Sequence, residues 1–157
     1  MHFYPIAVRI DQESVVIVGA GRIAERKVKQ LLLFGARVRV VAPEARNYIL
    51  RLVQEGRVTW SKRRYRSSDV VGARLVIAAT SDREINERIA QDAKKRGVLV
   101  NVVDHTAACE FISPAVICRR GLVISVSTDG KNPRRSKQFK DFLKRKLNEF
   151  HFSGNKL

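Results

Sequence analysis

The 157-residue sequence is poor in cysteine and histidine, and it has no long uninterrupted apolar stretch. Its two cysteines, Cys109 and Cys118, are too few for a disulfide framework, and their spacing is not that of a zinc or thioredoxin motif. Its three histidines show no HxxxH spacing, so we expect no metal site. The apolar runs are far shorter than the roughly 20 residues that cross a bilayer, which argues against a membrane protein.

The sequence also lacks a secretory signal and is poor in acidic residues. The first residues, Met1 to Pro5, lack the charged and apolar regions of a secretory signal, so we expect a cytoplasmic protein. Acidic residues are outnumbered, with 15 Asp and Glu against 31 Lys and Arg, a net charge of +16. About half of this excess lies in residues 119–157, which hold 11 basic and 3 acidic residues. It is either a solvated surface or the sign of an anionic partner, such as nucleic acid, a membrane surface or a polyanionic small molecule.

Short blocks of β-branched residues alternate with segments of helical periodicity through the first two thirds of the sequence. They predict strands at residues 15–18, 37–41, 58–60, 75–79 and 98–103, the last ending at Asp104. Helices are expected after Gly21, from about Ala45 to Gln54, and after Asp82, where Ile85, Ile89 and Ala93 would face inward. This order predicts an α/β fold, a Rossmann-like parallel sheet.

A glycine motif, Gly19-Ala20-Gly21-Arg22-Ile23-Ala24, follows the first predicted strand and opens the first helix. In this position Gly19 permits a tight turn, and Gly21 lets the backbone approach a pyrophosphate at the helix N-terminus. The motif favours dinucleotide binding over a turn with a purely structural role. The usual ribose-binding acid is absent from the end of the second strand. Glu44, just beyond it, either binds the ribose hydroxyls or begins the next helix.

Other candidate residues follow the fourth and fifth strands, whose carboxyl ends meet at one edge of a parallel sheet, where ligands bind. Ala79 and Thr80 end the fourth strand, and Asp104 ends the fifth. Asp104 is suited to act as a general base or to accept a metal, or else it is a turn-forming or capping residue. His105 either assists this chemistry or is a bystander.

The last third of the sequence has a different pattern. Two extended stretches, 111–118 and 122–126, are joined by a short turn, and a helix follows with Phe139, Phe142, Leu143, Leu147 and Phe150 on one side. A hairpin and one amphipathic helix cannot build an independent core. We therefore divide the chain into an NAD-binding Rossmann domain, residues 1–110, and a region, 111–157, that we expect to form a homodimer.

These motifs together resemble the precorrin-2 dehydrogenase family, the N-terminal part of siroheme synthases. The resemblance rests on residues 16–21, 24–27, 35–38, 41–44, 78–82 and 101–104, which read VIVGAG, AERK, GARV, VAPE, AATSD and NVVD. Two later segments, FISPA at 111–115 and SVSTDGKNP at 125–133, resemble the dimerisation region of the family. The match covers essentially the whole chain in the right order.

The resemblance implies NAD-dependent oxidation of precorrin-2 to sirohydrochlorin and, in some members, insertion of ferrous iron to give siroheme. It places the key carboxylate at Asp104 and a hydroxyl-bearing turn near the substrate at Ser127 and Thr128. The cofactor contacts that it implies fall on Arg22, Ile23, Pro43 and Glu44. Precorrin-2 carries acetate and propionate groups around its ring, so it is an anionic partner of the kind that the charge excess suggests.

A second hypothesis is a non-catalytic dinucleotide-sensing module whose basic tail binds nucleic acid. That tail shows no helix-turn-helix pattern and few aromatic residues among its basic ones, so nucleic acid is the less favoured partner. The sequence leaves open NAD against NADP, the presence of chelatase activity and its metal, and the basic residues that would bind substrate.

Overall fold

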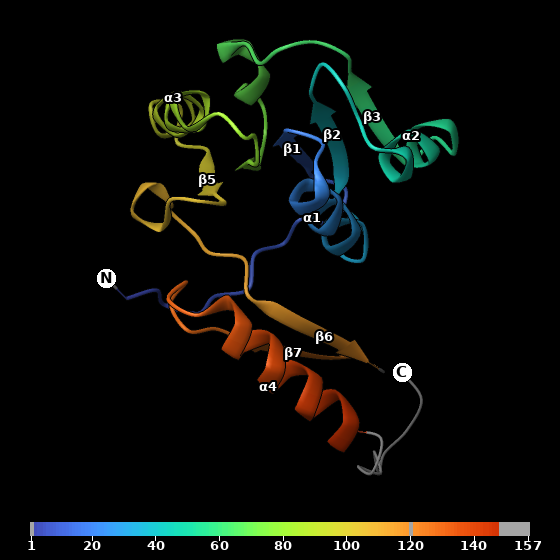
Figure 1. Cartoon of the computed structure of the whole chain (residues 1–157), viewed down its shortest axis with the longest axis vertical. Coiled ribbons are helices and arrows are strands. Elements are labelled where there is room, and N and C mark those ends of the chain that lie inside the picture. The colour runs from blue at the N-terminus through green and yellow to red at the C-terminus, as the bar shows by residue number, and fades with distance from the viewer. Residues whose placement is uncertain (1, 120, 148–157) are drawn as a thin grey trace. The chain divides into compact units, whose positions relative to one another are not determined.

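The computed structural model of the chain describes residues 2–119 and 121–147 (Figure 1). The chain divides into two compact units, Tyr4–Phe111 and Met1–Phe3 with Ile112–Leu157. Arg120 in the hairpin turn and Phe150 of the predicted apolar stripe lie outside the described residues.

The first unit is built on a five-stranded sheet of order β3-β2-β1-β4-β5, in which all neighbouring strands are parallel. The strands are β1 (Ser14–Val18), β2 (Arg37–Val41), β3 (Val58–Ser61), β4 (Leu75–Ala78) and β5 (Leu99–Val102). The helices are α1 (Arg22–Leu32), α2 (Asn47–Gln54) and α3 (Arg83–Lys94), with short 3-10 turns η1 (Ser67–Val70) and η2 (Thr106–Ala108). The predicted Rossmann-like parallel sheet is confirmed.

The central strands form the core because their side chains are buried on both faces of the sheet. Every residue of β4 is buried, and in β1 the same holds from Val15 to Val18. Val16 of β1 pairs with Arg39 of β2 on one side and with Val76 of β4 on the other. Continuous blocks of Val and Ile suit this position, since a parallel sheet is covered by helices on both sides.

Three predicted boundaries or faces were wrong. Helix α2 begins at Asn47 rather than Ala45, because Arg46 is extended and its Nε donates to Glu25 Oε1 on α1 at 3.1 Å. Strand β5 ends at Val102, and Asp104 lies in the turn that follows, although Val103 N still donates to Ala78 O at 3.1 Å. In α3, Ile89 and Ala93 are buried as predicted, and so are Asn86 and Ala90, whereas Ile85 is only half-buried.

The second unit contains an antiparallel hairpin, β6 (Ala115–Arg119) and β7 (Leu122–Val126), and helix α4 (Pro133–Lys146). Asn132 caps α4 by accepting from Arg135 N at 2.9 Å, and Pro133 suits the first helical position. Among the described residues of this unit only Ile117 and Ser136 are buried. Phe139 and Phe142 remain 52 % and 44 % exposed, so the described part of this unit has almost no core.

No helix within residues 2–119 and 121–147 combines the length and apolar character that spanning a membrane requires.

A buried carboxylate, Asp69, organises part of the basic surface of the first unit. Its side chain is 2 % exposed and accepts from Arg63 Nη2 at 2.6 Å, from Arg39 Nη1 at 3.1 Å and from the backbone N of Arg66 at 2.8 Å. Burial alone would raise the pKa of Asp69, but these hydrogen bonds outweigh it and lower the pKa to about 2. Arg63 and Arg39 therefore serve to hold η1 against the sheet.

This arrangement predicts a loss of stability in acid. The pKa of Asp69 in the folded protein, about 2, lies below its ordinary value of 3.8. Its contribution to the free energy of unfolding, about 2 kcal/mol, is therefore complete above pH 3.8 and disappears as the pH falls toward 2. Urea unfolding between pH 2 and 6 should show this slope in the wild type, and Asp69→Asn should be less stable at pH 6 and lack that part of the slope. An equal slope in both proteins would contradict this account.

Candidate functional site

The carboxyl edge of the sheet carries most of the predicted site residues. The strand order reverses between β1 and β4, and ligands of open α/β sheets bind outside the strand ends at such a point. Backbone hydrogen bonds continue past the strands there. Gly19 N donates to Val41 O at 2.9 Å, and Ala79 N donates to Val18 O at 2.8 Å. The loops that leave this edge therefore begin from fixed positions.

Gly19 is required by the chain itself. Its φ of +105° lies in the region that favours glycine, and a Cβ at this position would collide with the backbone carbonyl of Ala79. The turn after β1 thus lies directly against the end of β4. Gly19, Ala79 and Thr80 are brought together, as the sequence predicted.

Gly21 has a different environment. A Cβ there would meet no atom of the described residues within 4 Å, and its φ of −80° is open to any residue. Gly21 precedes α1 without a side-chain cap, whereas Asp82 caps α3 by accepting from Ile85 N at 3.1 Å. Arg22 and Ile23 beside it are exposed. Open space over uncapped backbone N–H groups suits the pyrophosphate of a dinucleotide, because it is an anion.

The loop after β2 contributes the remaining predicted cofactor residues. Pro43 and Glu44 are exposed, and Trp60 Nε1 donates to Ala42 O at 3.0 Å, which holds the start of this loop. The alternative in which Glu44 begins the next helix is wrong, because α2 starts only at Asn47. Glu44 makes no hydrogen bond or ion pair within the described part of the chain, so its carboxylate is available to ribose hydroxyls.

A residue that the sequence analysis missed, Asn86, connects the end of β4 to the turn after β5. Its Oδ1 accepts from Thr80 Oγ1 at 2.7 Å and from Thr80 N at 3.2 Å. Its Nδ2 donates to Thr80 O at 3.2 Å and to the Asp104 carboxylate, at 3.3 Å to Oδ1 and 3.4 Å to Oδ2. The signal that could have found it is a polar side chain three residues before Ile89, on the buried face of α3.

Asp104 itself is exposed, and within residues 2–119 and 121–147 its carboxylate is bonded to Asn86 rather than to a backbone N–H. Beside it, His105 Nδ1 lies 3.9 Å from Glu87 Oε1 and has no hydrogen-bond partner among the described residues. Those residues contain no group of three or more His, Cys, Asp or Glu side chains that could hold a metal ion.

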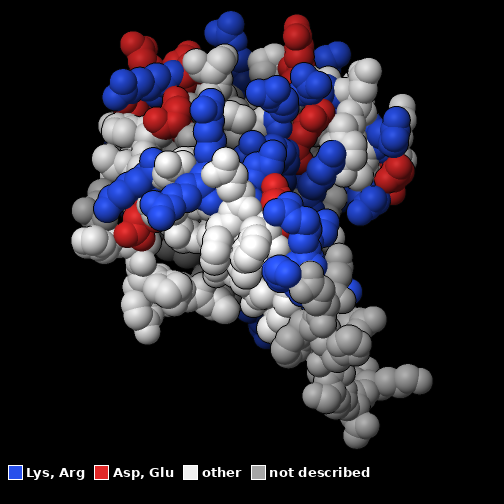
Figure 2. All heavy atoms as spheres, turned by 60° about the horizontal axis from the view of Figure 1, so that its bottom comes forward, with Lys and Arg blue, Asp and Glu red and all other residues white. Residues whose placement is uncertain are grey.

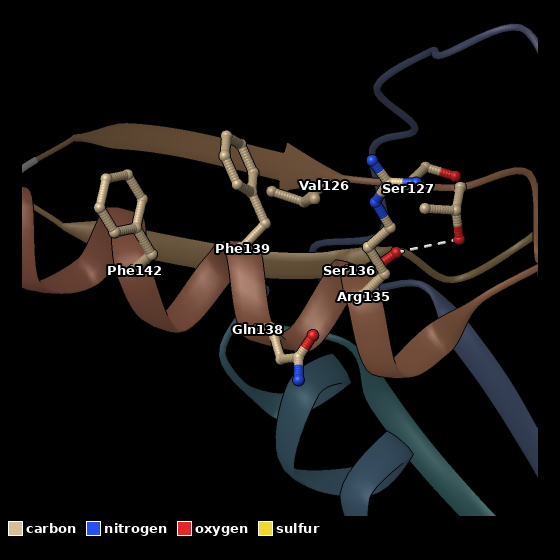
Figure 3. Close-up of a pocket in the computed structure, with 8 residues that line it drawn as sticks. Val126, Ser127, Arg135, Ser136, Gln138, Phe139 and Phe142 are labelled. Atoms are coloured by element: carbon tan, nitrogen blue, oxygen red, sulfur yellow. Dashed lines mark hydrogen bonds between the residues drawn. The ribbon is translucent and has the colours of Figure 1, made fainter.

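Ser127 and Thr128 lie in the second unit, after β7. They line a pocket of about 620 Å³ together with Arg135, Phe139 and Phe142 of α4 (Figure 3). Thr128 Oγ1 lies 3.2 Å from Ser136 Oγ and accepts from Asn132 N at 3.0 Å, so this hydroxyl also holds the start of α4. Figure 3 shows both phenylalanine rings projecting from one side of the helix, away from Gln138.

Lys and Arg side chains gather across the face drawn in Figure 2, with Asp and Glu scattered among them. Helix α4 contributes to the excess of positive charge, with seven Lys and Arg residues against one Asp in its 14 residues. Residues 57–66 form another basic cluster, with Arg57, Lys62, Arg63, Arg64 and Arg66, but Arg63 of this cluster is paired with Asp69. The charge that is available to an anionic ligand is therefore smaller there than the sequence suggests.

Comparison with known proteins finds one family model, described as "Putative NAD(P)-binding", that matches residues 6–115. Among curated relatives, a siroheme synthase of Pseudoalteromonas atlantica is 42 % identical over 133 residues, which are 85 % of this chain and 29 % of that protein. A siroheme synthase of Chromobacterium violaceum is 41 % identical over 133 residues, 85 % of this chain and 28 % of that protein. The chain thus spans about three tenths of the length of these relatives.

Among solved structures, one titled "SirC, precorrin-2 dehydrogenase" superposes with a TM-score of 0.77 at 28 % identity, covering 92 % of this chain and 71 % of that one. D-lactate dehydrogenase of Escherichia coli superposes with a TM-score of 0.50 at 14 % identity, covering 66 % of this chain and 32 % of that one. The second similarity concerns the fold alone.

The two glycines of the motif should respond differently to substitution. Gly19→Ala places a side chain against Ala79 in a strained backbone conformation, so we expect it to lower the free energy of unfolding by about 2 kcal/mol or more. Gly21→Asp should leave the fold stable, because its side chain meets open space and a carboxylate favours a helix N-terminus. It should weaken NAD binding by about tenfold or more, a loss of ~1.4 kcal/mol, since the carboxylate takes the place of the pyrophosphate.

Thermal unfolding and titration calorimetry with NAD measure the two effects separately. Gly21→Ala is the matched control for added volume without charge. NAD affinity that is unchanged in a folded Gly21→Asp protein would rule out this helix terminus as the pyrophosphate site.

Proposed function

This chain belongs to the NAD(P)-binding family whose model matches residues 6–115, and on that premise we propose that it is an NAD-dependent dehydrogenase that oxidises precorrin-2 to sirohydrochlorin. The observation that carries the proposal is the edge of the sheet where the open N-terminus of α1 follows β1 and the carboxylate held by Asn86 follows β5, the two strands on either side of β4. The similarity to siroheme synthases and to a structure titled precorrin-2 dehydrogenase supports the substrate.

The residues of the first unit that would hold NAD are those that follow β1, β2 and β4. The N–H groups at the start of α1 would bind the pyrophosphate, Glu44 would accept from the ribose hydroxyls, and Ala79 and Thr80 would lie toward the nicotinamide. When bound, NAD supplies the acceptor for the hydride that leaves the macrocycle. The protein contributes by orienting the two reactants and excluding competing geometries.

Oxidation of the macrocycle also releases a proton, and Asp104 is the proposed base. Its carboxylate is exposed, so a substrate can reach it, and Asn86 restricts its position. It follows β5, the strand next to β4, which places it on the same edge as the cofactor residues. The proposed base thus follows the strand next to β4, which is followed by two of the proposed cofactor residues, and this placement supports its role as the general base.

The anionic substrate fits the basic character of the chain. We propose that the Ser127–Thr128 turn and Arg135, which line one pocket, bind carboxylate groups at the rim of precorrin-2. The guanidinium of Arg135 suits a carboxylate, and hydroxyls can donate to one. We also propose that the chain inserts ferrous iron into the product, and an assay with sirohydrochlorin and ferrous ion tests this separately.

We further propose that the chain works as a homodimer joined through its second unit. The hairpin and α4 bury only Ile117 and Ser136 among their described residues and leave Leu122, Val123, Phe139 and Phe142 exposed. The rings of Phe139 and Phe142 are stacked with centroids 6.0 Å apart, which forms a compact apolar surface. Such a surface is stabilised when a second copy covers it.

Asp104→Ala tests the proposed function. We expect the variant to bind NAD as the wild type does but to lose about 10²–10⁴-fold in kcat, the usual contribution of a general base. The measurement is the appearance of NADH absorbance when precorrin-2 is added to protein and NAD. Glu110→Ala, which removes an exposed carboxylate shortly after η2, is the matched control and should keep wild-type rates.

Different outcomes separate the parts of the proposal. No NADH formation by the wild-type protein would refute the dehydrogenase. Wild-type rates in Asp104→Ala would refute only the base. Salt-sensitive retention on DNA without turnover would favour a nucleotide-sensing module instead.

The dimer predicts that Phe139→Asp with Phe142→Asp is monomeric, because two charges would be buried in the proposed interface. Sedimentation velocity at micromolar concentration should show a dimer for the wild type and a monomer for this variant. Lys137→Ala with Lys144→Ala on the same helix changes the net charge by the same two units, so it is the control for charge alone and should remain dimeric. A wild-type protein that sediments as a monomer would contradict the proposal.

A further inference from the structure

Asn86 is the most completely buried polar side chain near the proposed site, with no exposed surface. It lies in the first turns of α3, and its amide fills the space between the end of β4 and the turn after β5. A buried amide of this kind is stable only if its donors and its acceptor are all satisfied. Here each of them is bonded to Thr80 or to Asp104.

The direction of the amide follows from its partners. Thr80 N is a donor only, so the atom 3.2 Å from it must be the amide oxygen, and Thr80 Oγ1 also donates to that oxygen at 2.7 Å. The amide nitrogen must then face Thr80 O and the Asp104 carboxylate, both of which only accept. One N–H goes to each, so the carboxylate receives a donor whose direction is fixed by the backbone at the end of β4.

We propose that Asn86 is the positioning residue of the site. It holds the Asp104 carboxylate at a fixed place relative to Thr80, at the edge of the sheet proposed to bind the cofactor. The proposal rests on the dehydrogenase function given above and deepens it. Thr80 borders the proposed nicotinamide position, and Asp104 is the proposed base. Because the Asn86 side chain bonds to both Thr80 and Asp104, it would fix the distance between the proposed hydride acceptor and the proposed proton acceptor. The rate of catalysis is sensitive to small changes in such a distance.

The residue type matters as much as its place. Aspartate at position 86 would be almost identical in shape and would still accept from Thr80, but it would present an oxygen to Thr80 O and to the Asp104 carboxylate. Leucine or alanine would leave Thr80 N, in a half-buried residue, without its partner. Asparagine offers an acceptor on one side and donors on the other, as these partners require.

The test compares Asn86→Ala and Asn86→Asp in two backgrounds, the wild type and Asp104→Ala. In the wild-type background we expect Asn86→Ala to lower kcat by about tenfold, the worth of one hydrogen bond to a charged group. Asn86→Asp should lower it further, because it sets a carboxylate against Asp104. The dissociation constant of NAD should change by a smaller factor than kcat does, since the helix terminus proposed to bind the pyrophosphate is untouched. Gln91→Ala, on the exposed face of α3, is the control.

In the Asp104→Ala background the same substitutions should have no further effect on the residual rate, measured in single turnovers. A structural role would instead lower the rate by the same factor in both backgrounds, and this result would overturn the proposal. Wild-type kcat in a folded Asn86 variant would overturn it as well. If Asn86→Ala does not fold, the response of the Asn86 side-chain amide signals to Asp104→Ala carries the test.

A second readout does not depend on turnover. The side-chain amide signals of Asn86 in ¹H–¹⁵N spectra should shift on Asp104→Ala and stay in place in the Glu110→Ala control. An unchanged amide signal would overturn the positioning role even if the enzyme is active. A wild-type protein that forms no NADH while the amide still responds to Asp104→Ala would refute the dehydrogenase, and the catalytic part of this proposal with it.

Discussion

The candidate site depends on one close approach, that of the turn after β1 to the carbonyl of Ala79 at the end of β4. Only glycine at position 19 allows it, because of both the positive φ and the absence of a Cβ. The approach lets only three residues separate the end of β1 from the start of α1, at the point where the strand order reverses. The helix terminus, the end of β4 and the Asn86 amide are thereby gathered at one edge, and everything proposed about cofactor and base rests on that arrangement.

The sequence predicted the sheet well because its signal is local and strong. Blocks such as Val15–Val18 are buried on both faces, so their composition alone identifies strands of a parallel sheet. The boundaries depended on side-chain contacts between distant segments and were less predictable. Arg46 stays outside α2 while it pairs with Glu25 of α1, a contact that periodicity does not encode.

The same distinction applies to the site. Strand ends and the glycine motif located Gly19, Gly21, Ala79 and Thr80, because parallel strands share an edge whatever the rest of the fold does. Asn86 was missed because a polar residue in an amphipathic helix is ordinarily assigned to the solvent face. Its burial depends on where β5 and the following turn place Asp104. Helical spacing predicted that Ile85 faces inward. It overlooked Asn86, the next residue, which lies about 100° away around the helix.

Asp69 and Asn86, two buried polar residues of the first unit, have different roles in this chain of charge +16. Asp69 stabilises the fold, whereas Asn86 is proposed to position a catalytic group. Asp69 is surrounded by two guanidinium groups and is 2 % exposed, so its charge is fully used in holding η1 to β2. Asn86 is neutral and leaves the charge on Asp104, which is exposed and can meet a ligand. A carboxylate held by arginines in this way would be a poor base, because giving it a proton would cost those interactions. A neutral amide fixes the carboxylate in place at a smaller cost to its reactivity, which is the physical reason to look for the base at Asp104 rather than at the more conspicuous Asp69.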